Sequence, residues 1–344
     1  MTSAIFLHPA LYCFLGAALI LASPRRPVRF MLPLFGVAAL ACVLSLSSEA
    51  SISLAWLGLD LKLMRVDSLS SIFAHVFAVQ AILGLVFALH VKDPLHQAAS
   101  LSYVGGAFGC VFAGDYLTLF VFWEVMSVAS TFLVWLNRAP SSTRAGFRYF
   151  LFHILGGLLL LAGLLIRYGE LGTLEFMPVN PAGAAPYDWL IMAGFCVNAA
   201  VVPLHAWLPD AYPEATVTGA VFMSAFTTKT AVYVLARGFA GFEILAVAGV
   251  AMCLYGVFYA TIENNARRIL AYHIVSQVGY MVAGIGVGTA MTVNGACVHA
   301  YAHILYKGLL FMGAGCLLFS TGTAKLTELG GLVGRLPWVF VLYM

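Results

Sequence analysis

The chain has 344 residues, of which 62% are hydrophobic and 9% are charged, and its formal net charge is +3. Soluble domains carry about 25% charged residues, whereas this chain has a mean hydropathy of +0.97. These figures exclude a soluble globular protein or a nucleic-acid-binding protein and indicate an all-α polytopic membrane protein.

Apolar segments long enough to cross a bilayer recur along the chain. A helix needs about 20 apolar residues to span a hydrocarbon layer about 30 Å thick. Segments bounded by charge, Pro or Gly predict eleven transmembrane helices, within a few residues, at 4–22, 28–46, 69–91, 97–113, 116–136, 148–169, 188–208, 216–237, 243–262, 268–288 and 294–319.

A twelfth apolar segment begins near Leu336 and has nine residues up to Met344. Nine residues cannot cross a bilayer as a helix. We therefore expect a truncated chain, with a re-entrant end as the alternative.

The first apolar segment is predicted to be a retained helix. It has no basic leader, and SPRRPVRF follows it where a signal peptide would have a small-residue cleavage site. The seven cysteines lie in predicted helices without a CxxC pair, so neither a metal site nor a disulfide framework is indicated.

The sequence has no phosphate loop, no GxGxxG in a strand-to-helix context and no cysteine cluster for iron–sulfur ligation. We therefore expect no cofactor and no catalytic chemistry in the chain itself. The longest loops, 47–68 and 170–187, are too short to hold a core. We therefore expect one membrane domain. Its energy source would be an ion gradient or a partner subunit.

The basic residues predict the orientation in the membrane, because Lys and Arg favour cytoplasmic loops. Loops assigned to one side carry Arg25, Arg26, Arg29, Lys92, Arg138, Arg144, Arg148, Arg267, Arg268, Lys325 and Arg335. Loops of the other side carry Lys62, Arg65, Arg167 and Arg237. The first side is predicted to be inside and the N-terminus outside, in a plasma membrane of prokaryotic type.

Glu124 lies eight to nine residues into the predicted helix 116–136, and no loop can accommodate it. At about 1.5 Å per residue it is near the bilayer centre, where an ionised side chain costs at least about 2.5–3.5 kcal/mol. We expect the carboxyl to face the bundle and either to pair with a cation or to be protonated. Both states suit a proton carrier; the alternative is a structural ion pair.

The next two predicted helices carry His153 and a proline-rich stretch. His153 is a candidate for the proton path or a buried structural histidine. Proline inside a helix removes a backbone hydrogen bond, so we expect a break near Pro203, with His205 directly beyond it. Broken helices mark ion sites in transporters, and a simple packing kink is the alternative.

Lys229 lies near the middle of the predicted helix 216–237, too far from either end for its ammonium to reach the interface. It is a natural partner of Glu124 or the next proton carrier. A structural ion pair is the alternative.

His299, His303 and Lys307 are spaced by four residues and share one face of the helix 294–319. Histidine titrates near physiological pH, so the row is typical of a proton relay. Metal binding by the two histidines is a weaker alternative, since no third ligand is near in sequence. His273 and Gln277 could extend the row through water, with a buried, satisfied histidine as the alternative, and His75 is a weaker candidate.

Five motifs together resemble the antiporter-like family that the D subunits of Mrp-type cation/proton antiporters share with the proton-pumping membrane subunits of respiratory complex I. They are FVFWEVMS, PLHAWLPDAYPEAT, FTTKTAVYVLAR, NNARRILAYHIVSQVGYM and HAYAHILYKGLLFMGAG, in order, and the resemblance runs from about residue 95 to 340.

The resemblance implies fourteen helices, with helices four to eight repeated upside down by nine to thirteen and helices seven and twelve broken. The implied parts are 1–96, an N-terminal three-helix region; 97–240, the first repeat; and 241–344, an incomplete second repeat. Glu124, Lys229 and the His299, His303 and Lys307 row match the family's ionisable positions.

The sequence departs from the family pattern at two places. The family usually has a lysine five residues before the proline of PLH, and this chain has Asn198 there. Asparagine can hydrogen-bond a carboxyl group but carries no charge, so Lys229 would have to hold Glu124 more directly, or Glu124 would be protonated more often. The ionisable residue of the family's twelfth helix is also not in this sequence.

Three functions are compatible with these residues. The first is a subunit of a multi-subunit antiporter that exchanges Na⁺ or another monovalent cation for protons. The second is a proton-pumping subunit of a complex I-like dehydrogenase or membrane-bound hydrogenase. The third is a scaffold subunit without transport. Each implies other membrane subunits as partners.

Overall fold

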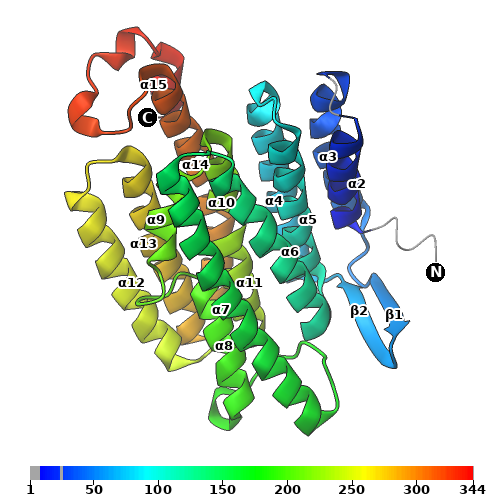
Figure 1. Cartoon of the computed structure of the whole chain (residues 1–344). Helices are drawn as coiled ribbons and strands as arrows, with labels where there is room; N and C mark the ends of the chain where they lie inside the picture. Colours follow the sequence, from blue (N-terminus) through cyan, green and yellow to red (C-terminus); the bar gives the residue numbers. More distant parts are fainter. Residues whose placement is uncertain (1–7, 24–25, 344) are drawn as a thin grey trace.

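The computed structural model describes residues 8–23 and 26–343, which form a bundle of helices lying side by side (Figure 1). Residues 4–7 of the first predicted helix, Arg25 and Met344 lie outside the described residues. The described part is helical except for one β-hairpin and the connecting loops.

Eight of the eleven predicted spans are helices long and apolar enough to cross a membrane, counted over the described residues. They are α3 (Arg26–Ser45), α4 (Ser68–Phe87) with the turn η1 (Ala88–His90), α6 (Tyr116–Trp135), α7 (Pro140–Leu171), α10 (Val217–Ala225) with α11 (Thr227–Gly238), α12 (Glu243–Ile262), α13 (Ala266–Val287) and α14 (Ala290–Thr321). The chain is an integral membrane protein with multiple spans.

The other three predicted spans are helical but shorter or more polar. They are α2 (Pro9–Ala22), α5 (Pro94–Phe112) and α8 (Pro186–Asn198). α5 has 19 residues but includes His96, Gln97 and Ser100, all buried against other helices. Protein contacts therefore replace part of the apolar surface that a lipid-facing helix would need.

The predicted break near Pro203 is confirmed. α8 ends at Asn198, residues 199–206 are irregular, and α9 (Trp207–Glu214) continues the segment. The peptide bond between Val202 and Pro203 is cis. The Trp207 indole donates a hydrogen bond of 2.9 Å to the Val197 carbonyl, which holds the two half-helices together across the break.

A second break divides the predicted helix 216–237 at Phe226, between α10 and α11. Neither proline nor glycine lies there, so the sequence carries no local signal for it. The span containing this break is enclosed entirely by other parts of the protein. Backbone groups freed inside a membrane are tolerated where protein can satisfy them.

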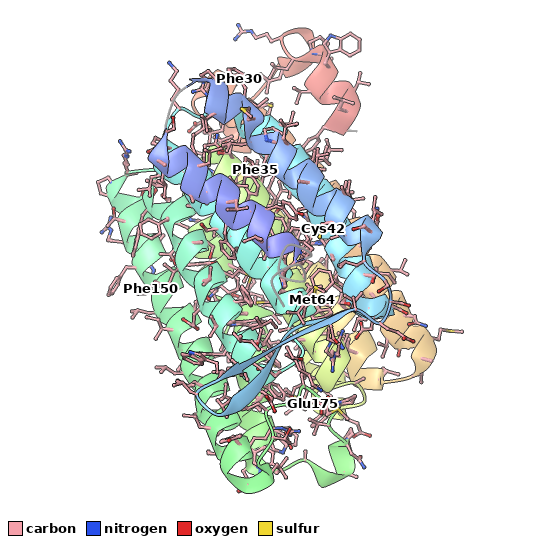
Figure 2. The ribbon with its side chains drawn as sticks, turned by 90° about the vertical axis from the view of Figure 1, so that its right-hand side faces the viewer. Phe30, Phe35, Cys42, Met64, Phe150 and Glu175 are labelled. Carbon is pink, nitrogen blue, oxygen red and sulfur yellow. The ribbon has the colours of Figure 1, made fainter. Side chains whose placement is uncertain are left out.

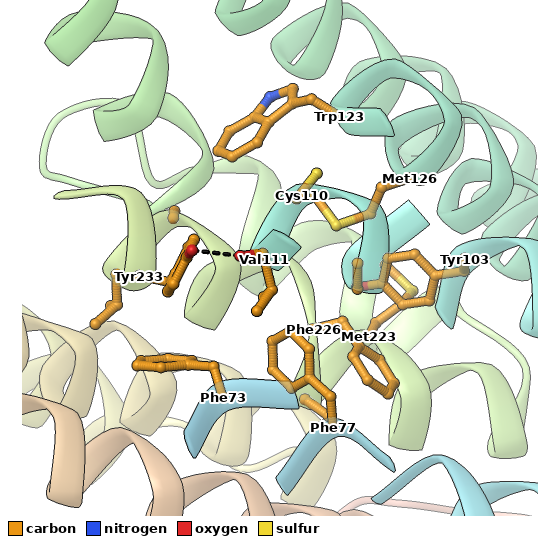
Figure 3. Close-up of a cluster of buried hydrophobic side chains, with 14 of the residues drawn as sticks. Phe73, Phe77, Tyr103, Cys110, Val111, Trp123, Met126, Met223, Phe226 and Tyr233 are labelled. Atoms are coloured by element: carbon orange, nitrogen blue, oxygen red, sulfur yellow. Dashed lines mark hydrogen bonds between the residues drawn. The ribbon is translucent and has the colours of Figure 1, made fainter. Parts of the chain in front are cut away.

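Aromatic side chains surround this second break (Figure 3). The Phe226 ring lies 5.0 Å from that of Phe77 in α4 and 5.4 Å from that of Tyr103 in α5, measured between centroids. In α11, Tyr233 packs on Phe73 and donates its hydroxyl to the Val111 carbonyl. The core of the bundle is thus built around α11.

The membrane-spanning part is all-helical, as predicted, and the loop 47–68 adds a hairpin that was not predicted, with the antiparallel strands β1 (Ser51–Trp56) and β2 (Leu59–Arg65). Leu57 and Gly58 form the tight turn, both with positive φ, as type I′ hairpin turns require. Alternating apolar residues in LDLKLMR carried the strand signal. The hairpin lies at the opposite end of the bundle from α15 (Pro337–Tyr343) (Figure 1).

Contacts with distant loops hold the hairpin against the bundle (Figure 2). The Lys62 amide donates to Asp115 Oδ2 at 2.7 Å, and the Lys62 carbonyl accepts from the Gly114 amide at 2.9 Å. The Lys62 ammonium forms an ion pair of 2.6 Å with Glu175. Hydrogen bonding to Lys62 lowers the pKa of the Glu175 carboxyl below its usual value.

Asp67 joins the hairpin end to two helices. It caps the N-terminus of α4 by accepting from the Ser70 amide and pairs with Arg237 at the end of α11, at 2.7 Å. Partial burial acts to raise the pKa of Asp67, but the hydrogen bonds from Arg237 and Ser70 outweigh it, so the pKa is lowered. The carboxylate therefore remains charged at neutral pH and fixes this corner of the bundle.

At the C-terminal side, α14 is followed by the turns η3 (Leu326–Glu328) and η4 (Leu332–Gly334) and then by α15. The connector 170–187 contains one further turn, η2 (Pro181–Gly183). Both connectors were expected to be loops, and both are.

Candidate functional site

Glu124 lies in the middle of α6 with its carboxyl against α7. A side chain at Gly157 would collide with Oε1 of Glu124, so the carboxyl rests on the α7 backbone. Oε1 is buried and has no hydrogen-bond partner within the described residues. The other side of Glu124 borders a groove of about 450 Å³ between α2, α5 and α6, which also includes Ser102 and Phe132.

Asn198 is the last residue of α8, next to the first break. Its side chain is fully buried, and neither amide atom has a hydrogen-bond partner in the part of the chain that the structure describes. A Cβ placed at Gly156 would lie 3.2 Å from Oδ1 of Asn198. Gly156 and Gly157 thus let α8 and α6 approach the same turn of α7, bringing Asn198 and Glu124 to either side of it.

His153 lies one turn before this glycine pair on α7. Its ring is fully buried, 4.0 Å from the ring of Tyr149 and 4.7 Å from that of Trp207 between centroids. Both ring nitrogens lack hydrogen-bond partners among residues 8–23 and 26–343. Glu124, Asn198 and His153 therefore form one polar group at the junction of α6, α7 and the broken α8–α9 segment.

His205 lies in the break itself but turns away from this group. Its ring packs at 4.2 Å on Tyr255 of α12. The sequence predicted that His205 would follow the break, and the structure separates it from His153 by directing it to another helix.

Lys229 lies at the second break. Its side chain is fully buried, and its ammonium donates to the Ser224 carbonyl at 2.6 Å. That carbonyl is freed because the helix is interrupted at Phe226, so the break supplies the lysine with an oxygen partner. Lys229 also interacts electrostatically with Lys307, His299 and His303.

The row on α14 is arranged as its spacing predicted. The rings of His299 and His303 stack with centroids 6.0 Å apart. Lys307, one turn further on, is fully buried, and its ammonium points to the Leu270 carbonyl of α13 at 3.4 Å. His273 of α13 interacts electrostatically with both Lys307 and His299.

Lys229, His273, His299, His303 and Lys307 therefore form a second polar group, built from α11, α13 and α14. No carboxylate forms an ion pair with either lysine among the described residues. Glu124 likewise has no ion-pair partner in these residues, so the direct Glu124–Lys229 contact considered from the sequence is not formed.

Gln80 of α4 is a candidate that the sequence reasoning missed. It is fully buried, its amide packs on Gly308 next to Lys307, and neither amide atom has a partner in the described chain. Phe77 packs on Phe226 and Gly84 on Phe222, so Gln80 faces the second break from the turn between them. An amide within an otherwise apolar helix was the available signal.

The weaker candidates have defined partners. A hydrogen bond of 2.9 Å joins His75 Nδ1 to the Tyr301 hydroxyl, linking α4 to α14. Gln277 accepts from the Tyr306 hydroxyl at 3.2 Å. His75 and Gln277 therefore connect neighbouring helices, and neither belongs to the two polar groups as a free side chain.

A bundle of membrane-spanning helices with breaks beside buried ionisable side chains is typical of membrane proteins that move ions. Residues 113–344 match the family described as NADH:quinone oxidoreductase/Mrp antiporter, TM. The chain belongs to this family of membrane subunits.

Among its relatives, the D subunit of the Na(+)/H(+) antiporter of Alkalihalophilus pseudofirmus is 32% identical over 256 residues, which cover 69% of this chain and 51% of that protein. The Hydrogenase-4 component B of Escherichia coli is 28% identical, covering 80% of this chain and 46% of that protein. The chain thus spans about half the length of these curated relatives.

One solved structure with the same fold is the Mrp complex from Dietzia sp. DQ12-45-1b. One of its chains has a TM-score of 0.87 and 25% identity, and the match covers 99% of this chain and 69% of that one. This structural neighbour is therefore a subunit of a multi-subunit membrane complex.

Proposed function

We propose that the chain is a membrane subunit of a multi-subunit antiporter that exchanges Na⁺ or another monovalent cation for protons. The observation that carries this proposal is the cluster of Lys229, His303 and Lys307, all fully buried and near one another. Buried charges without counter-ions are costly. Such a cluster is more stable when only some of its members are protonated. Groups that are only partly protonated can accept and release protons, as a relay requires.

Repulsion between the two lysines couples their protonation. Lys229 and Lys307 interact electrostatically with each other, and His303 interacts with both. A proton that arrives at one lysine therefore favours release from the other. The carbonyls of Ser224 and Leu270 give each ammonium one partner while it is charged.

In the proposed path, Glu124, Asn198 and His153 form the first station, and Lys229, His273, His299, His303 and Lys307 form the second. The unpartnered atoms of Asn198 and His153 support this role, because buried polar groups normally find a partner in protein or ordered water. His205 lies in the first break, and its ring faces Tyr255 of α12. Asn198 is the neutral substitute for the family's usual lysine.

The proposal includes other subunits of the same complex as partners, an N-terminus outside a prokaryotic plasma membrane, and the inverted repeats at 97–240 and 241–344. These features rest on the family resemblance and on the distribution of basic residues.

A second candidate is a proton-pumping subunit of a redox-driven complex. A chain of the membrane-bound sulfane sulfur reductase, an archaeal respiratory membrane complex, has a TM-score of 0.87 and 26% identity to this chain. Purification with iron–sulfur or flavin subunits would favour this candidate over the antiporter. A scaffold without transport is the third.

Cation-driven pH change in everted vesicles that contain the whole complex tests the proposal. We expect Glu124→Gln and Lys229→Ala each to lower exchange at least about tenfold, because each removes a proton-carrying group. Glu175→Gln and Lys325→Ala are matched controls at exposed ion pairs. Exchange at wild-type level in both Glu124→Gln and Lys229→Ala, with normal assembly, would leave the scaffold function.

A further inference from the structure

The groove beside Glu124 is almost entirely apolar. It lies between α2, α5 and α6 and has a volume of about 450 Å³, which is within the range of roughly 300–1,000 Å³ that small-molecule sites occupy. Eight of the ten described residues that line it are apolar, and the other two are Ser102 and Glu124. A single carboxyl group therefore lies in a groove that is otherwise suited to hydrocarbon.

The lining residues differ in exposure. Ala98 of α5 and Ala129 of α6 are buried, and their small side chains leave space between the two helices. Leu21 of α2, Leu95 of α5 and Val128 of α6 are exposed. Exposed apolar side chains on membrane-spanning helices face the hydrocarbon layer, so we infer that the groove opens sideways into the bilayer.

The groove is long and begins near one end of the bundle. Leu95 lies two residues after Asp93, which pairs with Arg138 at that end. From Phe132 to Glu124, α6 advances by eight residues, which is about 12 Å along the helix axis. This length suits a short hydrocarbon chain whose polar end reaches Glu124.

The charge of Glu124 limits what can fill the groove. The carboxyl has no ion-pair partner among the described residues. An ionised side chain surrounded by acyl chains is unfavourable, so a lipid chain by itself is a poor occupant. A molecule with an apolar body and a positively charged end complements both the lining and the carboxylate.

We propose that this groove is a binding site for a lipophilic ammonium compound, an alkylamine in its protonated form, which enters from the bilayer. The ammonium pairs with the Glu124 carboxylate and donates to the Ser102 hydroxyl, and the alkyl chain packs on Leu95 and Phe132. The bound cation holds Glu124 in its charged form and so removes it from the proposed proton path. Only this last consequence rests on the proposed function.

Asn198 favours an external cation at this position. Its amide lies on the other side of the same turn of α7 and carries no charge. No ammonium of this chain therefore competes for the carboxylate from that side. A lysine at position 198 would supply such a competitor.

Photolabelling of the purified complete complex tests the site. The probe is octylamine with a diazirine in its chain, and octanol with the same diazirine is the neutral counterpart; mass spectrometry identifies the labelled residues. We expect the amine probe to label the groove segments of α5 and α6 at least about tenfold more than the neutral probe, because only the amine forms a charged hydrogen bond. Unlabelled octylamine should compete.

Variants show whether the charge of Glu124 is responsible. Glu124→Gln and Asn198→Lys should each lower amine labelling at least about tenfold, the first by removing the carboxylate and the second by pairing with it. Ser102→Leu fills the groove and should exclude both probes. Glu175→Gln, at an exposed ion pair, is the matched control and should label like wild type. Thermal unfolding of each complex confirms that the variant is folded.

A second groove is a reference within the same molecule. It has a volume of about 220 Å³, lies against α14 and α15, and is lined by residues such as Leu317 and Phe340. None of the described residues that line it is charged. The amine and the neutral probe should therefore label it equally.

Three outcomes would overturn the site. Equal labelling by both probes beside Glu124, or amine labelling that persists in Glu124→Gln, would make the groove an ordinary lipid-facing surface. Lack of labelling in the complete complex would show that another subunit covers it. None of these outcomes affects the proposed function, which is measured by exchange. Conversely, wild-type exchange in Glu124→Gln and Lys229→Ala would remove that function and leave a labelled site in place.

Discussion

Glu124 and Asn198 approach the same turn of α7 from opposite neighbours, yet neither has a cation beside it among the described residues. A lysine at position 198 would bring a positive charge to this turn. In the present chain the half-buried carboxyl has instead a neutral amide nearby, so its protonation is not fixed by a charge partner.

Asn198→Lys is expected to assemble normally when Glu124 is present, because the new ammonium can pair with the carboxylate. The double variant Asn198→Lys with Glu124→Gln leaves a buried lysine unpaired and should lose about 3–5 kcal/mol of stability. Thermal unfolding of the purified complexes measures the difference. Equal stability of the single and double variants would show that the two side chains do not pair.

The helices of this bundle approach one another closely at glycines, which have no side chain. On α7, Gly156 and Gly157 allow this close approach. Helices inside membranes commonly approach through small residues, because no hydrophobic effect drives them together. The result here is a polar site made from three elements, α6, α7 and α8. The break in α8–α9 leaves the unpartnered amide of Asn198 at this site, and the break in α10–α11 supplies the Ser224 carbonyl to Lys229 in the second polar group.

Gly157→Ala should displace the Glu124 carboxyl and lower cation-driven exchange, at a stability cost of about 1–3 kcal/mol from overpacking. Gly169→Ala is the control on the same helix, because nothing lies within 4 Å of the added methyl group. It should leave exchange unchanged and stability equal or slightly higher, since alanine favours helix. Unchanged exchange in Gly157→Ala would contradict the close α6–α7 contact.

Across the whole molecule, charged contacts gather at the two ends of the bundle. Lys62 with Glu175, Arg237 with Asp67 and Arg167 with Asp188 bind loops that the sequence assigned to one side. At the other end, Arg138 pairs with Asp93 and Arg148 with Asp210. The alternation of loops that was predicted from the apolar segments is therefore consistent with the contacts between loops.

Thiol labelling of single cysteine variants measures which end is outside. Ser53→Cys in the exposed hairpin should react with a membrane-impermeant maleimide in intact cells, and Gly330→Cys only in everted vesicles, if basic loops are inside. Wild-type protein gives the background from the native cysteines. The reverse labelling pattern would invert the proposed orientation and the direction of the path.

The positions of the helices, the break near Pro203 and the ionisable row on α14 followed from sequence because each has a local cause. Apolar length sets a span, proline removes a backbone bond, and a spacing of four puts side chains on one face. Glu124 and Lys229 were identified for the same reason, since a charge inside an apolar segment is visible without a structure.

Tertiary packing decided what these residues touch. The break at Phe226, the orientation of His205 towards α12 and the hydroxyl pairs Ser130–Tyr149 and Tyr103–Thr227 depend on helices far apart in the chain. The sequence determined by itself which ionisable residues lie inside the membrane-spanning segments, and the tertiary structure decided which of them lie near one another, because only packing brings distant helices together.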